Sequence, residues 1–190
     1  MFCVRQDAVT AGRIAAELLY RMLGPDANVA IFTRHYGSYI HHLTIEGFKQ
    51  MSVYFPLNII GVFENFEDGD RAIQTTERLL RMQPDIGGIY INSANGAAVC
   101  RYVMEMGLAG RVKIIASDLY KGMDEFIQKG VVQATVFQDP FTQARKCITN
   151  LYRAMVEGAK YNSEILIQPQ VVMFSNLQNY SKYIYTSNEG

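Results

Sequence analysis

Polar or aromatic side chains follow each of six short apolar runs in this sequence, and they are the residues best placed to do chemistry. Amide and carboxylate groups both pair with hydroxyls, and flat aromatic faces suit the apolar side of a sugar ring. The set predicts a binding site for a small polar ligand such as a sugar. Its members are Asp7 after residues 2–5, His35 and Tyr36 after 29–33, Asn65 and Phe66 after 58–63, Asn92 after 88–91, Asp118 after 112–116, and Gln138 after 131–137.

The same sequence lacks the usual catalytic motifs. It contains no GxSxG, HExxH, P-loop or GxGxxG motif, and Gly87-Gly88 precedes an apolar run instead of opening a helix. We therefore predict a protein that is not an enzyme and needs no cofactor, with an enzyme on a doubly wound sheet as the third alternative. His41 and His42 are adjacent and cannot share one helix face, so no metal site is predicted.

Each polar residue also has a simpler structural interpretation, and both are kept open here. Asp7 and Asp118 could cap the helices that follow them, which is a common use of Asp. Asn92 could be a turn residue with Asn95 as the helix cap, and Gln138 could simply end a strand.

The elements that must position these residues alternate between strand and helix. Apolar runs of four to seven residues fit buried parallel strands, and segments with a period of 3.6 between them fit helices. This pattern predicts a doubly wound parallel sheet with helices on both faces, in which ligands bind at the carboxyl ends of the strands. The helices are expected at residues 10–23, 39–54, 70–82, 95–106 and 122–129, and from Pro140 onward with Asp139 as N-cap.

Composition narrows the class of protein further. The chain has 190 residues, of which 49% are hydrophobic, and a formal net charge of zero, so disorder is excluded and a nucleic-acid-binding surface is not expected. No apolar run is long enough for a membrane helix. Cys3, Cys100 and Cys147 form neither a disulfide framework nor a zinc pattern, and the latter two are expected in the core. With no evident signal peptide, a cytoplasmic location is expected.

The pattern changes near the C-terminus. Residues 165–174 read as one extended segment, and residues 175–190 as a polar, loosely held tail. Before them, the helix that begins at Pro140 carries an apolar stripe of Phe141, Ile148, Leu151 and Met155. Such a stripe is not expected to stay exposed.

Several stretches resemble the type I periplasmic-binding-protein fold, as found in the effector-binding part of lac-repressor-type transcription regulators and in sugar-binding transport proteins. The similarity covers roughly residues 4–174, with no single decisive motif, and depends on order and spacing. The matching stretches are a strand, Asp and helix start at 4–15, Glu46-Gly47-Phe48, Ile89-Tyr90-Ile91-Asn92 followed by Asn95-Gly96-Ala97, the strand end at 114–118, and the segment 134–140 that ends in Gln138-Asp139-Pro140.

The resemblance implies a two-lobed protein that closes on a small ligand. It makes Asp7, Asn92, Asp118 and Gln138 ligand contacts and Phe66 an aromatic that packs on the ligand. Where members of the family often carry an Arg, this chain has Thr44, and His42 or Tyr36 are the residues expected to take its place.

The resemblance also implies a division of the chain. Residues 7–138 would form the second lobe, 139–163 a remnant of the first lobe, 164–175 a returning strand and hinge, and 176–190 a tail. Most of the first lobe would then be missing at the N-terminus.

The function implied is small-molecule sensing by the effector-binding domain of a transcription regulator. The implied partners are a small-molecule effector and a second copy in a homodimer, with operator DNA bound through a missing N-terminal domain and no membrane. The alternative is the solute-binding protein of a sugar transporter or the sensor domain of a membrane kinase.

Overall fold

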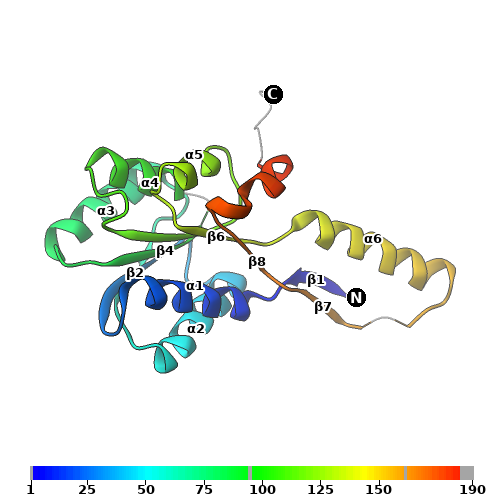
Figure 1. Cartoon of the computed structure of the whole chain (residues 1–190). Coiled ribbons are helices and arrows are strands. Elements are labelled where there is room, and N and C mark those ends of the chain that lie inside the picture. The colour runs from blue at the N-terminus through cyan, green and yellow to red at the C-terminus, as the bar shows by residue number, and fades with distance from the viewer. Residues whose placement is uncertain (1, 94–95, 161, 185–190) are drawn as a thin grey trace.

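The computed structural model describes residues 2–93, 96–160 and 162–184, which form a layered core and a narrow extension (Figure 1). The strands are β1 (Cys3–Gln6), β2 (Ala27–Thr33), β3 (Leu57–Glu64), β4 (Gly88–Asn92), β5 (Lys113–Ser117), β6 (Ala134–Phe137), β7 (Glu164–Ile167) and β8 (Gln170–Val172). The helices are α1 (Ala8–Leu23), α2 (Tyr39–Tyr54), α3 (Gly69–Met82), α4 (Gly96–Glu105), α5 (Met123–Gln128), α6 (Pro140–Val156) and the 3-10 helix η1 (Phe174–Tyr183).

The core is a six-stranded sheet between two helical layers. Its strand order is β3-β2-β4-β5-β6-β8, and every neighbouring pair is parallel except β6 and β8. Helices α1 and α2 cover one face, and α3, α4 and α5 cover the other (Figure 1). The predicted doubly wound parallel sheet with helices on both faces is thereby confirmed.

Alternation along the central strands fills both faces of the sheet. Ile31 and Tyr90 pack with α1 and α2, while their neighbours Phe32 and Ile91 pack with α3 and α4. All four side chains are fully buried. Continuous apolar strands of this kind are required when both faces of a parallel sheet are covered.

Two glycines let α1 and α2 lie against each other. A Cβ added to Gly12 would overlap the carbonyl of Thr44, and one added to Gly47 would overlap the carbonyl of Val9. Close backbone approach therefore fixes how α2 sits on the sheet, and with it the loop that joins α2 to the end of β2.

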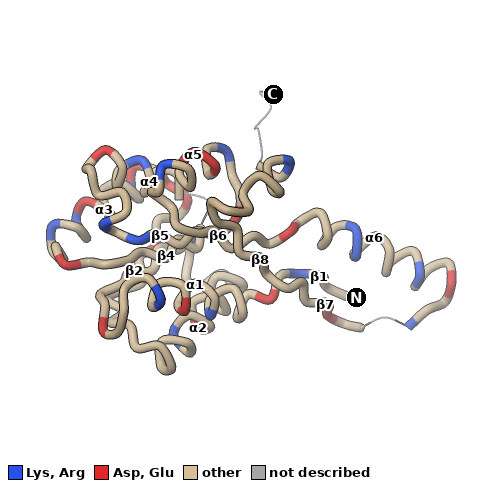
Figure 2. Tube along the Cα trace, in the orientation of Figure 1, with Lys and Arg blue, Asp and Glu red and all other residues tan. Residues whose placement is uncertain are grey.

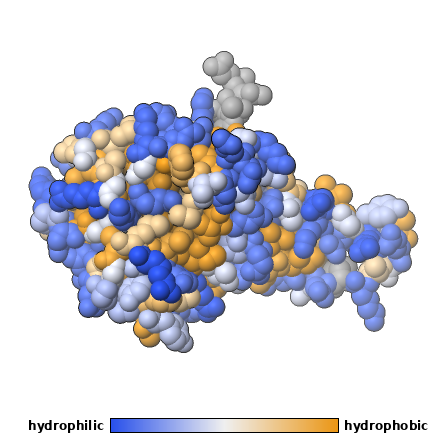
Figure 3. Space-filling model, viewed as in Figure 1, coloured by the Kyte–Doolittle hydropathy of each residue, from blue (hydrophilic) through white to orange (hydrophobic). Residues whose placement is uncertain are grey.

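The extension consists of β1, β7 and α6. β1 and β7 pair in parallel as a separate two-stranded sheet, and α6 runs beside them away from the core (Figure 1). None of the residues of α6 is buried, and Ile148 is 69% and Met155 77% exposed. Figure 3 shows hydrophobic atoms exposed along this extension. The apolar stripe predicted for this helix is present: Phe141 packs on Tyr183 of η1, and Ile148, Leu151 and Met155 are exposed.

Three sequence predictions are wrong in detail. Residues 165–174 are two strands in two different sheets, because Pro169 interrupts them and lacks the N–H that a continuous ladder needs. The strand expected at 131–137 starts only at Ala134, since Val131 and Val132 donate to the carbonyl of Phe126 in a turn. Cys147 is exposed, unlike the buried Cys100, because it lies on the uncovered α6.

The C-terminal tail is not loosely held over its described residues. Leu177 of η1 is 6% exposed, and Tyr180 packs on Phe137 and donates to Gln170 Oε1 at 2.8 Å. Its apolar residues are too few to give a helical period, so the sequence pattern missed the element. Residues 185–190 and Asn95, the alternative cap considered for α4, lie outside the described residues.

We predict that Ile115→Ala lowers the free energy of unfolding by about 2–5 kcal/mol, because it leaves a cavity in the middle of the sheet. Ile115 is fully buried between β4, β6 and α1. Urea unfolding measures the change. The matched control is Val53→Ala, at a position 79% exposed, for which a change within about 0.5 kcal/mol is expected. Equal losses in the two variants would contradict this assignment of the core.

Candidate functional site

A cavity of about 390 Å³ lies at the carboxyl ends of β4, β5 and β6. Three of the residues singled out from the sequence, Asn92, Asp118 and Gln138, line it together. Parallel pairing places these strand ends at one edge of the sheet, as the sequence analysis expected. The other residues at its wall are His41, Glu67, Ser93, Ser117, Leu119, Tyr120 and Pro140.

The cavity includes the point where the sheet reverses its winding. From β2 the chain moves outward to β3, then returns past β2 to β4 and continues through β5 and β6. The helices after β2 and β4 therefore leave in opposite directions and open a crevice between them. His41 of α2 and Asn92 of β4 meet there, where Asn92 Nδ2 donates to the backbone carbonyl of His41 at 3.3 Å.

Asp118 and Gln138 form a fixed polar pair at this edge. The backbone N–H of Gln138 donates to Asp118 Oδ1 at 3.1 Å, and its Nε2 donates to Oδ2. Thr135 Oγ1 donates to the carbonyl of Asp118 at 2.7 Å. Asp118 is held at φ 66°, in the left-handed region that costs energy for a residue with a Cβ. These bonds hold the carboxylate at the cavity in spite of that cost.

Burial raises the pKa of Asp118 from 3.8 to about 6, against the two hydrogen bonds from Gln138, which favour the ionised form. The carboxylate is still ionised at neutral pH and can accept hydrogen bonds only. Ligand hydroxyls that donate are its natural partners.

A strained turn after β3 brings Glu67 to the cavity. Phe66 and Glu67 have φ values of 51° and 60°, and Asn65 holds the turn by accepting from the N–H of Glu67 at 3.3 Å. Fully buried Asn65 also donates to Ser93 Oγ at 3.2 Å, which ties this loop to the end of β4. The Glu67 carboxylate lies 3.4 Å from the guanidinium of Arg34. Adjacent left-handed residues with side chains are uncommon and gather at functional sites.

The other predicted site residues do not line this cavity. Asp7 caps α1, where its side chain accepts from Thr10 N at 3.0 Å and Thr10 Oγ1 at 2.7 Å. The ring of Tyr36 packs edge-on against His42, with centroids 5.1 Å apart. The ring of Phe66 packs at a tilt against His35, with centroids 5.4 Å apart, and Phe66 is 46% exposed. Ligand roles for these four residues stay predictions.

His41 and Glu67 are the two titratable side chains of the cavity that the sequence analysis did not predict as site residues. His41 lies in the first turn of α2, eight positions after the end of β2, so reading only the residues next to each strand end overlooked it. Glu67 belongs to an acidic run before α3, and acidic residues before a helix commonly complement its dipole, so the run by itself does not indicate a site. A search that also covered the first turn of each following helix would have included His41.

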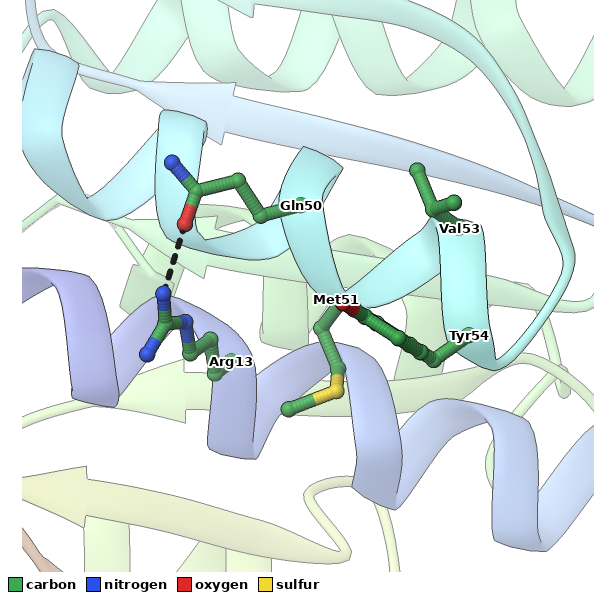
Figure 4. A pocket seen from close by; sticks show the side chains of 5 residues that line it. All are labelled: Arg13, Gln50, Met51, Val53 and Tyr54. Atoms are coloured by element: carbon green, nitrogen blue, oxygen red, sulfur yellow. Dashed lines mark hydrogen bonds between the residues drawn. The ribbon is translucent and has the colours of Figure 1, made fainter.

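A second pocket, of about 520 Å³, lies on the outer surface of α1 and α2 (Figure 4). Arg13 and Gln50 are its polar groups, and they already bond to each other, since Arg13 donates to Gln50 Oε1 at 2.8 Å. Met51, Val53 and Tyr54 form the rest of its wall. It is distant from the strand ends and lacks convergent free polar groups, so the cavity at Asp118 is the better candidate.

Charge and metal ligands give no competing site. Acidic and basic residues are interspersed over the elements of the core (Figure 2). Within the described residues, no group of three or more His, Cys, Asp or Glu side chains could hold a metal ion. None of the helices in the described ranges is long and apolar enough to cross a membrane.

The sequence profile described as "Periplasmic binding protein domain" matches residues 1–160. The comparison with curated proteins gives no significant match. The profile match and the solved structures below confirm the predicted periplasmic-binding-protein-like fold.

Among similar solved structures is a solute-binding protein of an ABC transporter from Agrobacterium vitis, bound to α-D-tagatopyranose. It has a TM-score of 0.89 and 21% identity over 97% of this chain and 63% of that one. A glucose-galactose binding protein from Geobacillus stearothermophilus has a TM-score of 0.84 and 23% identity over 92% and 62%. A periplasmic solute-binding protein of an ABC transporter from Actinobacillus succinogenes, bound to D-allose, has a TM-score of 0.83 and 24% identity over 95% of this chain and 64% of that one. This chain thus spans less than two thirds of their length.

The raised pKa of Asp118 predicts a pH dependence of folding. The folded protein holds the Asp118 proton more tightly than the unfolded chain between pH 3.8 and about 6. The contribution of Asp118 to the free energy of unfolding therefore falls as the pH rises through that window and is constant above it. We expect Asp118→Asn to remove this component, which urea unfolding of both proteins over about pH 4 to 8 measures. A difference between the two proteins that does not change with pH would contradict the assignment.

The cap on α1 gives a second prediction. Asp7→Ala should lower the free energy of unfolding by about 0.5–2 kcal/mol, because the N–H of Thr10 loses its acceptor. Asp7→Asn, which can still accept, should retain most of the stability. Thermal and urea unfolding compare the three proteins. If Asp7→Ala left stability unchanged but weakened ligand binding, Asp7 would be a ligand contact and not primarily a cap.

Proposed function

This chain belongs to the periplasmic binding protein domain family, and we propose that it forms the larger part of a receptor for a small sugar. The observation that carries the proposal is the cavity at the strand ends, where the side chains of Asn92, Asp118 and Gln138 converge. A carboxylate and two primary amides together accept from and donate to vicinal hydroxyls. Such a set suits the binding of a small polar ligand.

The identity of the ligand class has independent support from the similar structures. Three of them, at TM-scores of 0.83 to 0.89, are described as bound to tagatose, arabinose or allose. These are small polyhydroxylated rings, which match the donors and acceptors of this cavity. For this chain, a pentose or hexose is the proposed ligand.

We propose the solute-binding protein of a transporter as the biological setting. The similar structures support it, since they are described as transporter solute-binding proteins or sugar-binding proteins. The effector domain of a lac-repressor-type regulator would use the same cavity, and no observation on the described residues favours it. The two settings differ in compartment, so locating the protein in fractionated cells distinguishes them.

The extension of the chain supports a two-lobed arrangement. We propose that residues 139–163, with β1 and β7, belong to a first lobe that lies across the cavity from residues 7–138. The exposed apolar side chains of α6, such as Ile148, Leu151 and Met155, would then be covered by the remainder of that lobe. A single helix with no buried residue is otherwise unfavourable in water.

We predict that the full-length protein binds at least one member of a panel of D-pentoses and D-hexoses in isothermal titration calorimetry. Asn92→Ala and Gln138→Ala should each weaken that binding by about 1–3 kcal/mol, or about 5- to 150-fold, because each removes hydrogen bonds to a buried polar ligand. The matched control is Gln50→Ala in the pocket of Figure 4, an amide that the proposal leaves without a ligand role.

Two results would count against the proposed function. One is the absence of binding across the panel with folded wild-type protein. The other is a loss of affinity in Gln50→Ala equal to that in Asn92→Ala, which would move the ligand from the strand ends to the α1–α2 surface.

A further inference from the structure

His41 is held at the cavity by one contact of its ring and one of its backbone. Its Nδ1 lies 2.9 Å from Thr33 Oγ1 at the end of β2, and its backbone carbonyl accepts from Asn92 Nδ2. The residue is half-buried and lines the cavity. Because Nδ1 is engaged by Thr33, Nε2 is the ring nitrogen left for a ligand.

The hydrogen-bond needs of Thr33 select one tautomer of this ring. Thr33 is fully buried, and the contact with His41 is the sole one that its hydroxyl makes within the described ranges. If Nδ1 carried the proton, the hydroxyl would accept and its own hydrogen would have no acceptor in a buried site, which is costly. If Thr33 donates to Nδ1, its hydroxyl hydrogen has an acceptor. The ring then carries its proton on Nε2.

The charge of His41 agrees with this single tautomer. Burial lowers the pKa of His41, and the nearby Arg34 lowers it further, more than Glu67 raises it. The charged or titratable groups around the ring are Arg34, His35 and Glu67, and burial together with Arg34 favours the neutral ring.

Apart from His41, the charged side chains that line the cavity are two carboxylates, and the hydroxyls of Ser93, Ser117 and Tyr120 can both donate and accept. The carboxylates of Asp118 and Glu67 can only accept, and Gln138 and Asn92 each already spend one N–H within the protein. A sugar hydroxyl that donates to a carboxylate still has lone pairs on its oxygen. A fixed N–H donor beside those carboxylates would complete the hydrogen bonding of that hydroxyl.

We propose that His41 is a specificity-determining residue whose Nε2–H donates a hydrogen bond to one hydroxyl oxygen of the bound sugar. The inference rests on the proposed sugar-binding function and assigns a role to a residue outside the set predicted from the sequence. It places that role on the histidine whose ring is fixed by Thr33. His42, the neighbouring histidine, packs on Tyr36 and does not line the cavity.

The first experiment reads the tautomer directly. A long-range ¹H–¹⁵N correlation spectrum of the uniformly labelled full-length protein should show His41 protonated on Nε2 and not on Nδ1 at neutral pH. Thr33→Val should weaken or abolish this preference, because valine cannot donate to Nδ1. An Nδ1-protonated His41 in the wild-type protein would overturn the inference whatever the protein binds.

The second experiment tests the contact with the ligand. Calorimetry compares the best-bound monosaccharide with its set of mono-deoxy analogues, each lacking one hydroxyl. Wild-type protein should bind one analogue about tenfold or more weakly than the parent sugar through loss of the His41 bond. His41→Phe should bind the parent more weakly and lose discrimination against that analogue. Gln50→Ala, the control in the pocket on the outer surface of α1 and α2, should keep both affinity and discrimination.

The outcomes separate this inference from the proposed function. One outcome overturns the inference alone: sugar binding depends on Asn92, but wild type and His41→Phe discriminate equally between the parent sugar and its deoxy analogues. Absence of sugar binding by the wild-type protein overturns the proposed function and the inference with it. Thr33→Val provides a second variant if His41→Phe does not fold, and it should reduce discrimination while leaving the imidazole in place.

Discussion

The parallel pairing of β2, β4, β5 and β6 is the constraint on which the rest of the structure depends. Parallel strands buried on both faces must be apolar along their whole length, so polar side chains are displaced to the strand ends. The same pairing brings all the carboxyl ends to one edge. Asn92, Asp118 and Gln138 are far apart in sequence, yet they meet at this edge because each lies at the carboxyl end of one of the parallel strands.

Polar groups at that edge are kept usable by the bonds that surround them. Gln138 fixes the Asp118 carboxylate, Asn65 fixes the turn that carries Glu67, and Thr33 fixes the ring of His41. Each of these bonds spends one hydrogen-bonding group and leaves another facing the cavity. The backbone strain at Asp118 and Glu67 persists because such bonds hold the loops in place. A preorganised site of this kind loses little freedom when a small ligand binds.

The core and the extension differ in how far their apolar side chains are buried. The six-stranded sheet buries apolar side chains on both faces, whereas α6 leaves Ile148, Leu151 and Met155 of its apolar stripe exposed. An apolar stripe is therefore buried in α1, whereas no residue of α6 is buried. In α1 the close approach at Gly12 gives the helix a partner, whereas α6 lies beside the short β1–β7 sheet and contacts η1 through Phe141 and Tyr183. In the two-lobed arrangement proposed above, this extension belongs to the first lobe.

Local pattern in the sequence determined the alternation of strands and helices, the helix cap at Asp139, and three cavity residues, because periodicity and caps depend on near neighbours. It could not separate β7 from β8, place η1, or show that Cys147 is exposed, since each depends on a partner distant in sequence. It also could not choose between cap and ligand for Asp7. His41 entered the cavity only through tertiary structure. The packing of α1 on α2 and the pairing of β2 with β4 decide which side of α2 faces the strand ends, and no spacing along the chain encodes that contact.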